Sequence, residues 1–227
     1  MVEANMRVSL IIPALDEAES LSLLLAEVPA NLVHQVIVVN NGSIDRTAEV
    51  AQAAGALVIN EPRRGYGFAC AAGTAAADGE VLAFLDGDGS FLPRELTNLL
   101  TPLAEGRADL VLGSRMHMHK VPMPFHQRFG NLLFAWLLRQ RFGLQLTDLG
   151  PYRAVRRELL LHLKMQERTY GWPLEMIIKT ARHGKPIVEV PVTYRPRLAG
   201  QSKVGGTLRG SILAAYRFFY VLLRYAV

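Results

Sequence analysis

The sequence predicts an α/β fold whose doubly wound, mainly parallel sheet is flanked by helices. Two observations support this prediction: short β-rich apolar runs alternate with helical segments, and polar residues follow the ends of these runs. Strands and helices that alternate along a chain form parallel sheets, which bind ligands beyond the carboxyl ends of their strands. With 227 residues, the chain suits one domain of this kind.

Each expected strand is a short run rich in apolar and β-branched residues. The first run, 7–13, reads R-V-S-L-I-I-P and suits a strand buried on both faces. Pro191 makes the last run an edge or irregular strand, because proline cannot donate a ladder hydrogen bond. The expected strands are 7–13, 35–39, 56–59, 81–85, 108–112 and 187–195.

Helical segments follow these strands. An acidic first turn leads into a leucine-rich stripe after the first strand, as is typical of a helix start. An alanine-rich segment and apolar stripes at helical spacing predict further helices. They are expected from residue 48, over 68–77, 96–103, 129–142 and 169–182, and in the C-terminal segment 207–227.

Polar residues follow each of the first four strands, and the carboxyl ends of parallel strands meet at one edge of a sheet. If these strands are neighbours, the polar residues line one crevice with carboxylate, amide and guanidinium groups, which suits a nucleotide diphosphate. The alternative is that loops are polar for solubility alone. The residues concerned are Asp16 and Glu17, Asn40 and Asn41, Arg63 and Arg64, and Asp86 and Asp88.

Asp86 and Asp88 stand one residue apart, directly after a buried strand, in the motif D-G-D-G-S. Residues two apart in an extended chain point the same way, so both carboxylates can face one point. Mg²⁺ and similar cations prefer oxygen ligands and are commonly held by one or two carboxylates plus substrate phosphates. A polar turn is the alternative, and it is the stronger interpretation for this pair taken alone.

Composition and missing motifs restrict the function. The net charge of +5 suggests an anionic partner. The sequence contains neither a G-x-G-x-x-G dinucleotide fingerprint after the first strand nor a P-loop. Cys70, the only cysteine, has small neighbours that favour a buried structural thiol in a reducing compartment. The first residues lack the pattern of a secretory signal, so we expect a cytoplasmic protein.

Two motifs between the last strands have alternative interpretations. His117, His119 and His126 suggest a metal site, but an irregular, partly apolar loop explains them better, and such loops are often lids or acceptor-binding segments. Asp148, in T-D-L-G-P-Y-R, is either a general base, an orienting group or a cap, and the local sequence favours the cap.

Two apolar helices are either packed on the domain or placed at a membrane interface. The helix over 129–142 carries Trp136, and the C-terminal helix combines aromatic residues with Arg217 and Arg224. These arginines leave uncharged runs well below the ~20 residues of a spanning helix.

The order and spacing of several motifs resemble the family 2 glycosyltransferases of GT-A fold. Within that family the chain is most similar to the branch of dolichol-phosphate mannose synthase and polyprenyl-phosphate glycosyltransferases. The motifs begin at Pro13 (P-A-L-D-E), Val39 (V-N-N-G-S-I-D-R-T), Arg63 (R-R-G-Y-G), Asp86 (D-G-D-G-S), Gly113 (G-S-R), Thr147 (T-D-L-G-P-Y-R) and Gly200 (G-Q-S-K).

The resemblance implies roles for individual residues and a divalent cation, Mg²⁺ or Mn²⁺. The family's usual Asp-Asp pair is Asn40 and Asn41 here, so base preference does not carry over. The implied nucleotide-sugar positions are Pro13, Leu15, Glu17, Asn40, Arg64, Gly65, Asp86, Arg197, Ser202 and Lys203; the metal positions are Asp86, Asp88 and Ser90; the catalytic positions are Asp88, Arg115, Arg128 and Asp148.

The function implied by the resemblance is inverting transfer of a hexose from a nucleotide-diphosphate sugar to a polyprenyl (dolichyl or undecaprenyl) phosphate at the membrane surface. A GT-A domain over 1–206 and an amphipathic helix over 207–227 would carry it, peripherally on the cytoplasmic face, with homo-oligomers allowed. The enzymatic alternative is a soluble transferase with a hydroxyl acceptor, for which Asp148 would remove the proton. A non-catalytic nucleotide-binding module is weaker, and scattered basic residues without a recognition motif argue against nucleic acid.

Overall fold

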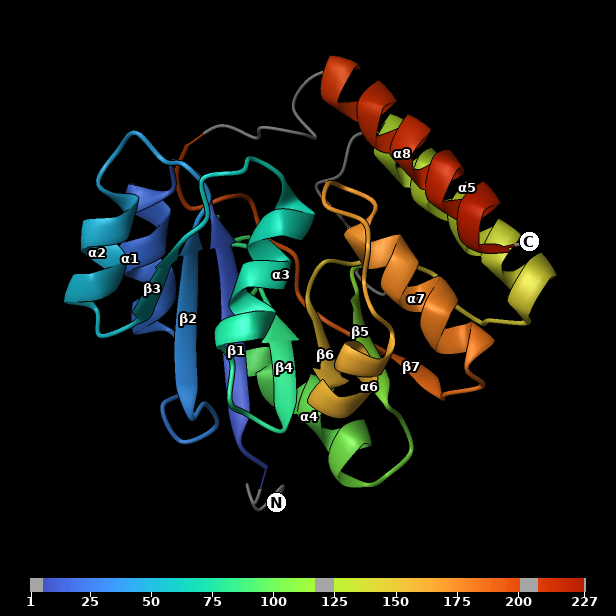
Figure 1. The fold of residues 1–227 in the computed structure, drawn as a ribbon, viewed down its shortest axis with the longest axis horizontal. Coiled ribbons are helices and arrows are strands. Elements are labelled where there is room, and N and C mark those ends of the chain that lie inside the picture. Colours follow the sequence, from blue (N-terminus) through green and yellow to red (C-terminus); the bar gives the residue numbers. More distant parts are fainter. Residues whose placement is uncertain (1–5, 117–124, 201–207, 227) are drawn as a thin grey trace.

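A computed structural model describes residues 6–116, 125–200 and 208–226. These residues form a seven-stranded sheet with the order β3-β2-β1-β4-β6-β5-β7, and helices cover both of its faces (Figure 1). Neighbouring strands pair in parallel except at β6, which runs antiparallel to both β4 and β5. The predicted α/β class, with a mainly parallel, doubly wound sheet, is therefore confirmed.

The elements alternate along the chain as the sequence predicts. The strands are β1 (Val8–Ala14), β2 (Gln35–Asn40), β3 (Leu57–Asn60), β4 (Val81–Phe84), β5 (Leu110–Ser114), β6 (Arg153–Arg156) and β7 (Ile187–Pro191). The helices are α1 (Ala18–Ala26), α2 (Thr47–Ala53), α3 (Tyr66–Ala76), the short 3₁₀ helix η1 (Pro93–Glu95), α4 (Leu96–Ala104), α5 (Phe125–Phe142), α6 (Arg157–His162), α7 (Trp172–Arg182) and α8 (Leu208–Ala226).

Strand β1 separates two apolar cores, one on each face of the sheet. Leu10 and Ile12 point into the core beneath α1 and α4, whereas Ile11 points into the core beneath α3 and α7. All three side chains are buried, because helices cover both faces. Helix α3 approaches β1 so closely that a Cβ on Gly73 would lie 2.4 Å from Cγ2 of Ile11.

The register of the parallel strands brings their carboxyl ends to one edge. Ala14 at the end of β1 pairs with Asn40 at the end of β2, and Asn40 pairs with Asn60 at the end of β3. Strand β4 pairs in parallel with β1 on the side opposite to β2. The first four strands are thus neighbours, as the crevice predicted from the sequence requires.

Strand β6 was not predicted, and it changes which segments reach this edge. Its four residues, R-A-V-R, begin and end with arginine and form no apolar run that periodicity would identify. Because β6 is antiparallel, its start lies beside the ends of β4 and β5 and brings the preceding loop there. The position of β7 at the sheet edge agrees with the prediction from Pro191.

Helices α5 and α8 lie side by side outside the sheet (Figure 1). Phe134 of α5 packs against Phe218 and Phe219 of α8, with ring centroids 5.2 and 4.9 Å away. Helix α8 packs on the domain through Val221, whose side chain is fully buried and lies next to Gly171, just before the start of α7. The predicted division of the chain after residue 206 falls within 201–207, outside the described residues, and stays a prediction.

Candidate active site

Two carboxylates, Asp86 and Asp88, follow β4 at the shared strand edge. Both oxygens of Asp88 have partners. Oδ1 accepts hydrogen bonds from the Ser90 backbone N–H (2.9 Å) and hydroxyl (2.6 Å), and Oδ2 accepts one from Arg197 (2.9 Å). Ser90 is buried, so it fixes the orientation of Asp88; its role as a metal ligand stays a prediction.

The carboxyl group of Asp86 is affected by the charge of Asp88. Burial, followed by the charge of Asp88, raises the pKa of the Asp86 carboxyl to about 7, against the lowering effects of Arg115 and of a hydrogen bond from Tyr66. A group in this state gains from a nearby cation. The pair is therefore suited to attract positive charge.

Arg197 joins the segment after β7 to the ends of β1 and β4. Its Nη2 donates to Glu17 at 2.6 Å and its Nη1 to Asp88 at 2.9 Å. The next N–H, of Leu198, donates to the Asp88 carbonyl at 3.0 Å. Gly89 has φ +72°, and a Cβ there would lie 2.4 Å from Leu198, so the turn between the carboxylates and the 197–198 segment requires glycine.

Asn40 ends β2 and is one of the residues predicted to bind the nucleotide. Its Oδ1 accepts from the Ser43 N–H at 3.0 Å, and its Nδ2 donates to Asn60 at 2.9 Å. Pro13 and Leu15, before and after the end of β1, are half-buried. An aspartate in place of Asn40 could not donate to Asn60, so the amide suits this local arrangement.

The side chain of Asn41 holds the loop that follows β3 through hydrogen bonds to its backbone. Its Nδ2 donates to the carbonyls of Glu61 (3.0 Å) and Arg63 (2.8 Å), and its Oδ1 accepts from the Gly65 N–H (2.8 Å). Gly65 has φ +149°, and a Cβ there would lie 2.5 Å from the Arg168 carbonyl oxygen. The amide of Asn41 therefore supplies donors that an aspartate would lack.

The charged residues of that loop have partners of their own. Arg63 pairs with Glu61 at 2.8 Å, and Arg64 donates to the Gly42 carbonyl at 3.1 Å. The hydrogen bonds and charge of Arg63 lower the pKa of Glu61 to about 2. Arg64 is exposed, so its proposed contact with a nucleotide sugar would exchange one carbonyl partner for an anion.

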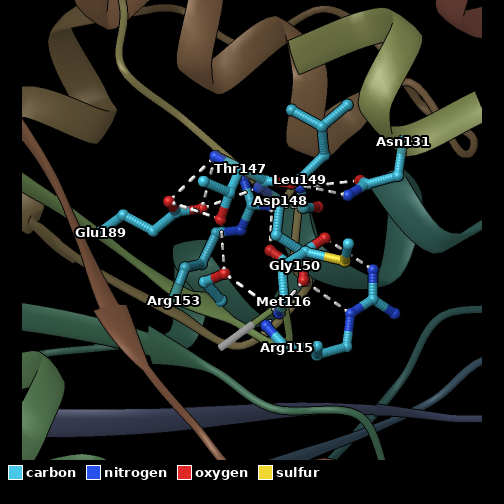
Figure 2. A network of polar contacts seen from close by, with 10 residues as sticks. Arg115, Met116, Asn131, Thr147, Asp148, Leu149, Gly150, Arg153 and Glu189 are labelled. Atoms are coloured by element: carbon cyan, nitrogen blue, oxygen red, sulfur yellow. Dashed lines mark hydrogen bonds and ion pairs between the residues drawn. The ribbon is translucent and has the colours of Figure 1, made fainter. Parts of the chain in front are cut away.

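Arg115, directly after β5, forms a bidentate ion pair with Asp148. Nε and Nη2 of Arg115 donate to the two carboxylate oxygens at 2.7 and 2.8 Å, and its backbone N–H adds a third bond of 2.9 Å (Figure 2). Asp148 is fully buried. Burial alone would raise the pKa of Asp148, but its bonds to Arg115 and the charge of Arg115 outweigh it and lower that pKa.

The surrounding residues fix Asp148 in place. Its backbone N–H donates to Glu189 of β7 at 2.8 Å. Asn131 of α5 holds both sides of the turn, donating to the Thr147 carbonyl and accepting from the Leu149 N–H, at 3.0 Å each (Figure 2). An ionised, buried and fully bonded carboxylate is poorly suited to accept a substrate proton. The geometry thus makes Asp148 a positioning residue for Arg115.

Tyr194 is a residue of the site that the sequence interpretation did not single out. Its ring lies 5.3 Å from the Arg115 guanidinium, and its ring centroid lies 5.3 Å from that of Phe91, which follows the two carboxylates along the chain. Burial raises the pKa of Tyr194 against the lowering effect of the Arg115 charge, and the charge of Asp88 raises it further. It lies just after β7, whose parallel pairing with β5 brings this segment beside Arg115, and no local pattern in the sequence marks it.

The remaining predicted residues lie apart from this cluster or outside the described chain. Arg128 lies near the start of α5 with an exposed side chain, and no hydrogen bond between described residues joins it to the carboxylates. Ser202 and Lys203, like His117 and His119, lie outside the described residues, and the His126 side chain is not described. Cys70 is buried, as predicted.

The chemistry of the carboxylate pair fits a divalent cation. Within the described ranges, no group of three or more His, Cys, Asp or Glu side chains is arranged to hold a metal ion. Two hard oxygen donors are nevertheless the protein ligands that Mg²⁺ commonly uses when substrate phosphates complete its shell. Asp86 and Asp88 could hold such an ion.

Comparison with known proteins identifies close relatives. A family model described as Glycosyl transferase family 2 matches residues 9–163. The chain is 43% identical over 215 residues to an uncharacterised glycosyltransferase of Mycobacterium tuberculosis, covering 95% of this chain and 97% of the relative. It is 35% identical over 225 residues to an undecaprenyl-phosphate mannosyltransferase of Micrococcus luteus, covering 90% of each.

The fold also matches a solved structure. Glucosyl-3-phosphoglycerate synthase from Mycobacterium tuberculosis, in complex with Mn²⁺, UDP and phosphoglyceric acid, gives a TM-score of 0.78 over 99% of this chain and 80% of that chain, at 23% identity. This likeness concerns the fold, and it confirms the predicted GT-A architecture.

Proposed function

This chain belongs to glycosyltransferase family 2, and from that premise we propose that it moves a hexose from a nucleotide-diphosphate sugar to a polyprenyl phosphate at a membrane surface. The observation that carries the proposal is the meeting of carboxylates and guanidinium groups at one sheet edge. Asp86 and Asp88 face Arg115 and Arg197 there. Such a site suits a donor diphosphate, a cation and an anionic acceptor together.

The donor would bind along the ends of β1 to β4. Asn40 would lie at the base, Glu17 and Arg64 along the nucleotide, and Asp86 and Asp88 at the diphosphate with Mg²⁺ or Mn²⁺. The similar synthase from Mycobacterium tuberculosis is complexed with Mn²⁺ and UDP, which supports this choice of ligands. A bound cation would supply positive charge to the leaving diphosphate.

In the proposed reaction, an oxygen of the acceptor phosphate forms a bond to the anomeric carbon while the bond from that carbon to the diphosphate breaks. The nucleoside diphosphate leaves, and the configuration inverts. The acceptor is already an anion, so no residue has to remove a proton. Arg115, held by Asp148, would offset the repulsion between the two anions, with Arg128 and Lys203 as further cations.

The membrane part of the proposal rests on the outer faces of α5 and α8. Trp136 of α5 is 55% exposed, and Tyr216 and Leu223 of α8 are 64% and 70% exposed. Aromatic, aliphatic and arginine side chains together suit the interface of a bilayer. We propose that these faces attach the protein peripherally, on the cytoplasmic side. In the described part of the chain, no helix has the length and apolar character to cross a membrane.

A second candidate is a soluble transferase that uses a hydroxyl acceptor. The similar synthase is complexed with phosphoglyceric acid, a small phosphorylated molecule. The site has a carboxylate, Asp148, on the acceptor side, but its bidentate pairing with Arg115 argues against its use as a base. The lipid acceptor is therefore preferred.

The experiment is a transfer assay with UDP- and GDP-sugars, Mg²⁺ or Mn²⁺, and a short polyprenyl phosphate. We expect a lipid-linked sugar with one donor, no product after metal chelation, and none with D88N. D78N is the matched control, because Asp78 carries an exposed carboxylate at the opposite edge of the sheet. Transfer to phosphorylated small molecules with no lipid product would favour the second candidate, and no turnover of any donor would overturn both.

A further inference from the structure

A second cavity, of about 290 Å³, lies between the start of α3, the segment 166–169 and the C-terminal half of α8. None of the donor-site positions named above lines it. Its walls combine arginine and aromatic side chains, which also occur together where proteins bind phosphate-bearing ligands. These side chains are Phe68, Arg168, Arg217, Tyr220, Arg224 and Tyr225.

The cavity carries an excess of positive charge. Arg168, Arg217 and Arg224 form no ion pair with any described carboxylate. Glu167 also lines the cavity, but it is 8% exposed and its Oε1 accepts from the Arg168 N–H (2.9 Å) and from the Thr169 N–H and hydroxyl. The cavity is thus lined by three guanidinium groups and one carboxylate, and that carboxylate already accepts hydrogen bonds from residues 168 and 169.

Arg168 and Arg224 donate hydrogen bonds to neutral oxygens, which are weaker partners than an anion. Arg224 donates to the Tyr220 hydroxyl at 3.0 Å and to Oε1 of Gln166 at 2.9 Å. Arg168 donates to the Met165 carbonyl at 2.9 Å. Hydrogen bonds from guanidinium to phosphate are shorter, charge-assisted and often bidentate. A phosphate that entered the cavity would therefore exchange weak partners for strong ones.

We infer that this cavity is a second anion site, separate from the donor crevice, that binds the phosphate of a lipid headgroup. Helix α8 supports the choice of a lipid, because the helix that supplies Arg217 and Arg224 also carries exposed Tyr216 and Leu223. Tyr220 belongs to both the cavity and the exposed face. Apolar side chains in the interface with arginines at headgroup depth are the arrangement of interfacial helices.

The inference rests on the proposed function only in naming a membrane as the source of the phosphate. A phosphate monoester or diester on a soluble molecule has the same chemistry. The site therefore has to be tested by direct binding, without a nucleotide sugar, and the donor reaction has to be followed separately as a measure of the proposed function.

The test is cosedimentation of the full chain with phosphatidylcholine vesicles that contain or lack phosphatidylglycerol. We expect R217Q/R224Q to lose the preference for the anionic vesicles by roughly tenfold or more, because two charge-assisted contacts are removed. The matched control is R107Q/K185Q, which removes the same charge from exposed positions at the opposite edge of the sheet. We expect it to keep most of that preference, and R217K/R224K to lie between.

Three outcomes would decide against the inference. An equal loss in R107Q/K185Q would mean that net charge alone attracts the protein. An unchanged preference in R217Q/R224Q would overturn the site. Binding of glycerol phosphate by the native chain that R217Q/R224Q abolishes, without any vesicle preference, would overturn the lipid assignment. Nucleotide-sugar hydrolysis by R217Q/R224Q is expected to match the native chain, which shows that the variant is folded and distinguishes this test from failure of the proposed function.

Discussion

Arg197 donates from Nη1 to Oδ2 of Asp88 at 2.9 Å, so the chain itself places a positive charge against the carboxylate proposed to bind a metal ion. The same guanidinium reaches Glu17 at 2.6 Å. The ends of β1, β4 and β7 are thereby tied together by one side chain. A bound cation would compete with Arg197 for Asp88 until a donor diphosphate offered Arg197 another anionic partner.

The first prediction concerns R197Q. Removing the competing charge should strengthen Mn²⁺ binding to the nucleotide-free protein several-fold, while transfer slows by roughly tenfold or more because the leaving diphosphate loses a charged donor. Calorimetry with Mn²⁺ and the transfer assay measure the two effects. R46Q is the control, because Arg46 is 80% exposed and pairs with Glu49. Weaker Mn²⁺ binding in R197Q would contradict this competition.

The second prediction concerns the pair of Arg115 and Asp148. If Asp148 acts by holding Arg115, D148N and R115Q should slow transfer to lipid phosphate by similar factors, and the double variant should be little worse than either. Each single change should also lower the free energy of unfolding by about 3 kcal/mol or more, because it leaves a buried group without its partner. Urea titration and a double-mutant cycle test this. Additive losses in rate would instead assign separate roles.

The third prediction concerns the pH dependence set by Asp86. Its pKa of about 7 in the folded protein lies above the ordinary value near 4. Stability from this group is therefore present at low pH and is lost as the pH rises between about 4 and 7, at no more than about 1.4 kcal/mol per pH unit. In metal-free protein, D86N should become more stable relative to the native chain across this window. A constant difference in melting temperature would contradict it.

The fourth prediction concerns Gly65. G65A should lower the free energy of unfolding by about 1–3 kcal/mol and weaken nucleotide binding, because a Cβ there meets the Arg168 carbonyl. G55A is the matched control: Gly55 has φ +81° but nothing within 4 Å of an added Cβ. Both glycines have positive φ, so the larger loss expected in G65A reports the contact with Arg168 together with the stronger strain of a side chain at φ +149°. Equal destabilisation would show that the contact with Arg168 has no effect.

The fifth prediction concerns the exposed faces of α5 and α8. W136S and L223S should each weaken binding to polyprenyl-phosphate vesicles by roughly tenfold, since each removes apolar surface from the interface. L161S is the control, because Leu161 is half exposed on α6. Hydrolysis of the donor in solution should stay unchanged in all three. Full vesicle binding by the double variant would count against membrane attachment through this face.

Much of the fold follows from the first hundred residues, because continuous apolar runs closed by polar turns identify β1, β2 and β4 directly. The same strand ends predicted that Asp86, Asp88 and Glu17 would meet. Expected boundaries differ from the observed ones by one or two residues in this half, where pairing rather than composition decides the last strand residue.

The region around Arg115 and Asp148 was less predictable, for a physical reason. The pairing of Arg115 with Asp148 joins the end of β5 to the loop before β6, a strand that was not predicted. The local sequence around Asp148 favoured a cap. Tyr194 reaches the site only because β7 ends at Pro191 and lies parallel to β5. Long-range pairing of this kind leaves no periodic signal in the sequence, although the family motif at Thr147 marks the position.

Strand β6 also has a consequence for synthesis on the ribosome. It is made after β4 and β5, yet it is inserted between them. A nascent chain that has emerged only as far as β5 can pair β1 to β4, but it lacks the strand that joins β5 to that unit. The half of the sheet that contains β1 to β4 can thus assemble while the chain is still being extended, whereas the half that contains β5 must await residues 153–156.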